Sequence, residues 1–265
     1  MKFFRPLLNI FIQNKNEKTP ILKALLNIAI ITGSVTILVI HSLKKIDVTL
    51  DYSFLPGVSY KLGQGFKMTL IISVSSLVLS LLIGIISAAG HNSRILLIRY
   101  FFIGYVKLIR GTPLLAQIYL FYYIIGTAWG IENEIVSGIL ILSVFEGAYI
   151  SEIIRGSYLS MEQQQIEIGM AIGLDRIGIF REIIFPQMLA RTIPALTGQF
   201  ASIIKDSSLL SVIALTELAH TVREISSLNF KLFECYFLLA ALYLLLTLPI
   251  TYFSEWLERR FGYEN

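Results

Sequence analysis

Long apolar blocks alternate with shorter polar stretches along the chain. A hydrocarbon core about 30 Å thick is crossed by roughly 20 helical residues, and several of the blocks reach that length. The blocks predict transmembrane helices at residues 24–43, 68–90, 103–126, 135–155, 192–215 and 235–254. We therefore expect an all-α integral membrane protein with about six transmembrane helices.

The polar stretches between the blocks predict the loops. Residues 47–64 contain Pro56 and Gly57 and read as an external loop. Residues 1–18 lack a small-residue cleavage site and predict a retained cytoplasmic tail. The longest hydrophilic stretch, residues 156–186, lies between the fourth and fifth expected helices.

Composition and charge narrow the class of protein. Hydrophobic residues make up 55% of the chain and charged residues 15%, with a mean hydropathy of +0.71. A soluble domain needs more surface charge than this. The net charge is +4, but Lys and Arg lie between the apolar blocks, which argues against nucleic-acid binding. Their distribution favours cytoplasmic N- and C-termini by the positive-inside rule.

Residues 160–186 predict a helical hairpin. Ser160 and Gln163 form an S-x-x-Q capping box that would open a helix, and Gly173 suits the left-handed residue that ends one. Asp175 would then cap a second short helix that ends before Pro186. Such an amphipathic hairpin either docks a soluble partner or packs on its own bundle, and the pattern favours neither.

The same stretch resembles the EAA motif of ABC importer permeases, E-A-A-x-x-x-G followed by I-x-L-P. Glu167, Gly173, Ile183 and Pro186 stand at the matching positions. Three further stretches resemble the polar amino acid branch of that family. They are residues 110–123 (RGTPLLAQIYLFYY), 147–156 (GAYISEIIRG) and 204–211 (IKDSSLLS).

The match to the motif has departures. Ile168 and Gly169 stand where the family has two Ala, and Phe185 stands where it usually has Leu. The resemblance covers roughly residues 62–260, and the helix at 24–43 is not part of the usual five-helix core. It implies a transmembrane domain at 62–265 and an N-terminal addition at 1–61, which holds the tail, the extra helix and the external loop.

The resemblance also implies partners and a function. The chain would be a permease subunit in the cytoplasmic membrane, paired with a second copy or a close relative. Two ABC ATPase subunits would bind and hydrolyse ATP, and an extracytoplasmic binding protein would deliver a polar or charged amino acid. The ATPase would dock on the hairpin through Glu167, Gly173, Asp175, Arg176 and Pro186.

Three charged residues interrupt the expected fourth and fifth helices. Glu146 lies near mid-depth, and Lys205 and Asp206 lie inside the expected helix at 192–215, about 15 residues beyond Arg191. A charge at the bilayer centre costs about 2.5–3.5 kcal/mol, so each should face a partner or a cavity. We expect them to bind the amine and carboxylate of an amino acid. Internal salt bridges are the alternative.

A second set of residues is predicted to have a structural role. Glu152 and Arg155 can pair at i,i+3 on one helix face. Arg110 precedes Gly111 and Pro113, so we expect a bent backbone there. Arg110 would anchor the adjoining helix or bind a lipid phosphate, and a structural role is favoured for all five residues.

Motifs of other classes are missing from the sequence. It has no G-x-x-x-x-G-K-[ST], so the chain itself would not hydrolyse ATP, and no H-E-x-x-H, G-x-S-x-G or Cys/His cluster that would indicate an enzyme or a metal site. The remaining alternative is an ion channel or membrane receptor that acts without an ATPase. Such a protein would not need a cytoplasmic docking hairpin.

Overall fold

The computed structural model describes residues 20–261, and the tail expected at 1–18 lies outside the described residues. The described part contains helices and no strands. By its internal contacts the chain divides into two units, Met1–Asp51 and Tyr52–Asn265. The first contains helix α2 (Ile21–Lys45), which has no buried residues and is long and apolar enough to cross a membrane.

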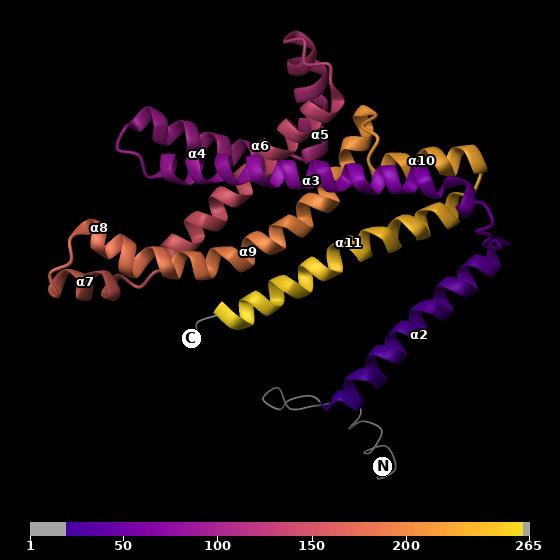
Figure 1. The fold of residues 1–265 in the computed structure, drawn as a ribbon, viewed down its shortest axis with the longest axis horizontal. Helices are drawn as coiled ribbons and strands as arrows, with labels where there is room; N and C mark the ends of the chain where they lie inside the picture. Colours follow the sequence, from indigo (N-terminus) through magenta and orange to yellow (C-terminus); the bar gives the residue numbers. More distant parts are fainter. Residues whose placement is uncertain (1–19, 262–265) are drawn as a thin grey trace. The chain divides into compact units, whose positions relative to one another are not determined.

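The second unit is a bundle in which the two most extensively packed pairs of helices are α3 with α6 and α9 with α11 (Figure 1). Its elements, in chain order, are α3 (Leu55–His91), α4 (Leu96–Gly111), α5 (Leu114–Tyr119), the π-helix η1 (Leu120–Gly126), α6 (Glu134–Leu159), α7 (Gln163–Ala171), α8 (Arg176–Gly178), the π-helix η2 (Ile179–Ile184), α9 (Phe185–Asp206), the 3₁₀-helix η3 (Ser207–Ile213), α10 (Leu218–Asn229) and α11 (Leu232–Phe261).

The expected count of six membrane crossings is not confirmed by helix length and composition. Within the described residues, α2, α3, α6 and α11 are long and apolar enough to cross, and the bent pair α4 with α5–η1 could form a fifth crossing. Helix α9 covers part of the expected fifth span but does not meet the same criterion. Polar residues such as Gln187 and Gln199 lower its hydropathy, so its place in the membrane depends on its packing against α11 and α6.

The prediction of a loop at residues 47–64 is wrong from Leu55 onward, because α3 begins there. Pro56 lies in its first turn, where a missing N–H and a fixed φ are tolerated. The 37 residues of α3 would extend about 55 Å, well beyond a hydrocarbon core of about 30 Å. The first turns of α3 instead pack against α10.

Small residues hold α3 against α6. Ser73, Ser76 and Ser80 of α3 are fully buried, as is Ser143 of α6. A Cβ added to Gly147 of α6 would lie 2.6 Å from Ile83, too close for any side chain to fit without movement. Such residues let helix backbones approach closely in a membrane, where packing replaces the hydrophobic effect as the driving force.

Helix α10 has its own core with the beginnings of α3 and α11. Leu218, Val222, Ile225 and Cys235 are buried there. The fully buried Glu217 caps α10 by accepting hydrogen bonds from the backbone N–H groups of Ala219 and His220, both at 2.7 Å. Within the second unit, α10 and the α7–α8 hairpin lie at opposite ends (Figure 1).

Candidate functional site

The segment between α4 and α5 is sharply bent, at the position where Arg110, Gly111 and Pro113 predict a bend. Thr112 and Pro113 are extended, and the axes of α4 and the α5–η1 segment differ by 111°. Pro113 has no N–H to donate to the carbonyl of Ile109, four residues earlier. The buried side chain of Gln117 donates to that carbonyl instead, at 2.8 Å. Sequence reasoning did not identify Gln117.

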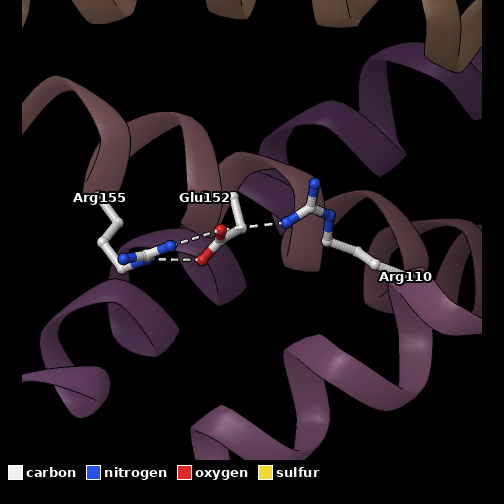
Figure 2. A network of polar contacts seen from close by, with 3 residues as sticks. All are labelled: Arg110, Glu152 and Arg155. Atoms are coloured by element: carbon white, nitrogen blue, oxygen red, sulfur yellow. Dashed lines mark hydrogen bonds and ion pairs between the residues drawn. The ribbon is translucent and has the colours of Figure 1, made fainter.

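A three-residue ionic network lies at the end of α4, just before this bend (Figure 2). Glu152 of α6 pairs with Arg155 through two hydrogen bonds of 2.7 and 2.8 Å. On its other side it forms an ion pair of 3.0 Å with Arg110, the penultimate residue of α4. The guanidinium of Arg110 also lies 5.3 Å from the ring centroid of Tyr149. The network therefore fixes the end of α4 to α6.

The hairpin begins differently from the expected capping box. Helix α7 follows Glu162, and no side chain caps it. Ser160 instead ends α6, because its hydroxyl donates to the carbonyl of Ser157 at 2.8 Å and accepts from Arg191. The predicted N-cap role of Ser160 is wrong, since its hydroxyl is already engaged on the α6 side.

The turn of the hairpin follows the sequence pattern closely. Gly173 has a φ of 88°, a left-handed conformation, and the N–H of Leu174 donates to the carbonyl of Gly169 at 3.1 Å. Asp175 caps the next helix by accepting from the N–H of Gly178 at 2.8 Å. A Cβ on Gly169 would lie 2.7 Å from Ile183, so the two arms are closely packed.

Pro186 does not stop the second arm, contrary to prediction. The chain continues from α8 through the π-helix η2 directly into α9, and Pro186 lies in the first turn of α9. The wider turn of the π-helix accommodates the proline inside the continuing helix, and π segments often mark functional sites. The second arm of the hairpin and α9 therefore form one continuous helix.

The outward surface of the hairpin is apolar with charges beside it. Ile168, Ile172 and Ile177 are all more than half exposed. Glu167 and Arg176 are exposed on the same short helices. A patch of this kind on a small element indicates an interaction surface.

Two hydrogen-bonded contacts join the hairpin to α9. The side-chain amide of Gln187 donates to Gln165 of α7 at 2.7 Å. Arg191 donates to the backbone carbonyl of Ser160 at 2.6 Å. Helix α9 therefore holds the first turn of α7 and the end of α6 just before it.

The structure places the three predicted substrate residues on two sides of α9. Glu146 is fully buried between α6 and α9, where Gln199 donates to its Oε2 at 2.5 Å. Asp206 is a close neighbour of the Glu146 carboxyl group. Lys205 faces away from this pair and lines a cavity.

The Lys205 cavity has a volume of about 560 Å³. The end of α9 and η3 form one wall, and α5, α10 and α11 form the rest. Arg223 of α10 lines it together with Ser208 and Ser211 of η3. Arg223 was not identified from the sequence, because it lies in a short polar segment with no recognisable motif. In the described part of the chain, no cluster of three or more His, Cys, Asp or Glu could hold a metal ion.

Comparisons with known proteins assign the class. Residues 80–263 match the family described as "Binding-protein-dependent transport system inner membrane component". The chain belongs to this family, whose members are membrane-embedded components of transport systems.

Individual relatives are permeases of amino acid transport systems. The glutamine transport system permease protein GlnP of Escherichia coli K12 is 34% identical over 199 residues, which cover 74% of this chain and 91% of GlnP. The L-cystine permease protein TcyB of Bacillus subtilis is 32% identical over 75% of this chain and 86% of its own length. The permease protein HisQ of Escherichia coli K12, for histidine, lysine, arginine and ornithine, is 30% identical over 78% of this chain and 95% of its own length.

The fold is also that of a solved transporter. A chain from a crystal structure of an amino acid ABC transporter with histidines superposes with a TM-score of 0.76 at 29% identity. The match covers all of that chain and 80% of this one. Sequence family and three-dimensional structure therefore agree on a permease subunit.

Proposed function

We propose that this chain is the permease subunit of an ATP-driven importer that carries a polar or charged amino acid across the cytoplasmic membrane. The observation that best supports this proposal is the hairpin at residues 160–186. The hairpin exposes an apolar surface, and Gln187 and Arg191 of α9 form hydrogen bonds with it. The named substrates of GlnP, TcyB and HisQ support an amino acid as cargo.

The hairpin surface would be the docking site for an ABC ATPase subunit in the cytosol. Two ATPase subunits would serve a pair of permeases, and an extracytoplasmic binding protein would load the opposite side. Both chain termini would then be cytoplasmic. The positions of the hairpin and α10 at opposite ends of the bundle support separate docking sites for these partners (Figure 1).

Residues 62–265 would form the shared transporter core and residues 1–61 an addition carrying α2. The family match begins at residue 80, and the solved relative is covered completely by 80% of this chain. Deletion of α2 would therefore leave ATP-dependent uptake intact if the core assembles without it.

Glu146, Lys205 and Asp206 would serve the translocation path. Lys205 already lines a cavity, and Glu146 and Asp206 lie just behind it in the α6–α9 contact. A cycle that opens this contact would expose the two carboxyl groups to the amine of the cargo. Glu146→Gln should lower affinity or change selectivity in uptake. Unchanged affinity and selectivity would remove Glu146 from the site.

The decisive experiment is reconstitution into proteoliposomes with the ATPase and binding-protein subunits of the same system. We expect uptake of glutamine, cystine or a basic amino acid only when ATP is present on the hairpin side. Gly173→Pro should abolish co-purification of the ATPase, because proline cannot adopt the φ of 88°. Gly156→Ala is the control, since a Cβ there meets nothing within 4 Å. Uptake without nucleotide would favour a channel.

A further inference from the structure

A second cavity lies between the hairpin and the bundle, away from Lys205. It has a volume of about 390 Å³, and α3, α6, η2 and α9 all contribute to its wall. The residues that line it include Ile85, Ala89, Asn92, Arg155, Phe180 and Met188. The cavity therefore lies at the ends of α3 and α6, beside the segment where the hairpin continues into α9.

The α3 side of the cavity is apolar and continues into an exposed apolar surface. Ile85 lines the cavity and is more than half exposed, as are Leu82 and Ile86 of the same helix. Helix α3 is long and apolar enough to cross a membrane, so its exposed apolar side chains suit contact with lipid acyl chains. An acyl chain can therefore enter the cavity from the α3 side without leaving an apolar environment.

Arg155 places hydrogen-bond donors at the same cavity. Its Nε and one terminal nitrogen donate to Glu152, at 2.7 and 2.8 Å. Within residues 20–261, its other terminal nitrogen has no hydrogen-bond acceptor. A guanidinium carries five N–H donors in a planar fork that suits a phosphate, so Arg155 has donors left for a ligand.

The charge around the cavity is positive. In the ionic network of Figure 2, two arginines share the single carboxylate of Glu152, which leaves one net positive charge. Arg94, two residues after Asn92, adds an exposed cation on the turn between α3 and α4. An anionic group is therefore favoured at this cavity over a neutral one.

We propose that this cavity binds one anionic phospholipid of the inner leaflet, with the phosphate on Arg155 and an acyl chain along Ile85 and Ala89. The leaflet rests on the proposed function, which places the hairpin in the cytosol. Basic pockets between transmembrane helices on that side of a membrane bind anionic headgroups. The lipid would contact Phe180 and Met188 as well as α3, and so join the second arm of the hairpin to the bundle.

The test is native mass spectrometry of the assembled transporter, delipidated in detergent and titrated with palmitoyl-oleoyl-phosphatidylglycerol. Phosphatidylcholine with the same acyl chains is the neutral comparison. We expect one tight phosphatidylglycerol site for each copy of this chain, at least about tenfold tighter than phosphatidylcholine, because a hydrogen bond to a charged group contributes this much. Glycerol 3-phosphate in excess should not displace the lipid, since it lacks the acyl chain.

Two variants separate the headgroup from the acyl chain. Arg155→Gln should weaken phosphatidylglycerol binding about tenfold and leave phosphatidylcholine binding almost unchanged. Ala89→Phe places a ring in the cavity and should weaken binding of both lipids. Val78→Phe, also exposed on α3 but outside the cavity, is the matched control for Ala89→Phe. Arg259→Gln, whose side chain is 82% exposed, is the control for the loss of one positive charge.

Each outcome decides the proposal. Unchanged phosphatidylglycerol affinity in either variant overturns it, as does an equal loss of both lipids in Arg155→Gln. Displacement by glycerol 3-phosphate assigns the cavity to a free phosphate and also overturns it. All of these results leave the importer function standing. Absence of ATP-dependent uptake would refute the importer function without changing lipid binding, whereas a hairpin found outside the cell would refute the assignment to the inner leaflet.

Discussion

Two prolines at helix junctions have opposite consequences. At Pro113 the helix ends and the chain turns by 111° into α5. At Pro186 the helix continues from η2 into α9. The local sequences give a partial signal, since Gly111 and Thr112 precede Pro113 whereas Ile184 and Phe185 precede Pro186.

The difference lies in what surrounds each proline. At Pro113 the carbonyl of Ile109 is satisfied by Gln117, and the end of α4 is fixed to α6 by the ionic network, so the bend is stabilised. Pro186 lies inside a continuous helix just after the π-helix η2, and the wider π-helical turn accommodates its ring and its missing N–H. A proline therefore permits a break, and tertiary contacts decide whether one forms.

The largest expected effect is at Glu152, the centre of the network. Glu152→Ala leaves Arg110 and Arg155 close together without their shared carboxylate. We expect a loss of about 2 kcal/mol in the free energy of unfolding, less than for a fully buried pair because both arginines are partly exposed to solvent. Thermal unfolding in detergent measures it. The control is Glu255→Ala, which loses only an exposed pair of 3.8 Å. Equal effects of the two would contradict the structural role.

Gln117→Leu should cost up to about 2 kcal/mol, because it leaves the buried carbonyl of Ile109 unsatisfied. The double variant with Pro113→Ala restores an N–H four residues after Ile109. We expect part of the lost stability to return in the double variant, in a double-mutant cycle of unfolding. Additive losses would show that Gln117 does not replace the missing donor.

Arg191→Gln tests the contact between α9 and the hairpin. Its stability cost should be about 1 kcal/mol, since the contact with Ser160 is exposed. The decisive measurement is the ratio of ATP hydrolysed to amino acid imported. In Arg191→Gln this ratio should rise several-fold while the ATPase stays bound. A normal ratio would exclude Arg191 from coupling. Arg191→Lys, which keeps a donor, should partly restore the ratio.

Pro186→Ala should have the smallest effect, less than about 0.5 kcal/mol, because the π-helix before Pro186 already accommodates the proline in a helix that continues through it. Pro113→Ala should reduce transport more, since it favours a straight helix across the bend. Parallel uptake and unfolding measurements on both variants compare the two junctions directly. A larger effect at Pro186 would reverse the comparison.

Much of the fold follows from the sequence. Residues 24–43, 135–155 and 235–254 lie within α2, α6 and α11, because long apolar blocks in a membrane have few alternatives to helix. The helical start at Leu55 could not be read in this way, since Pro56 and Gly57 signal a turn as readily as a first helical turn. The beginning of α3 is stabilised by packing against α10, which lies far away in the sequence.

The candidate site was predictable only in part. Gly173 and Asp175 carry local signals that act within a few residues, and both have the expected geometry. The engagement of Ser160 with Arg191 and of Glu146 with Gln199 depends on contacts across 31 and 53 residues. Arg223 has no local signal in the sequence, because only the folded structure places it in the cavity that it shares with Lys205.

The central claim is that the hairpin faces the cytoplasm and docks the ATPase, and cysteine labelling of the hairpin tests it most directly. Cys235 is the single cysteine of the chain and is buried, so a cysteine placed at Ile177 can be labelled selectively in sealed right-side-out and inverted vesicles. The account predicts labelling only from the cytoplasmic side, with protection when the ATPase subunit is bound. Labelling from the exterior, or equal labelling with and without the ATPase, would contradict it.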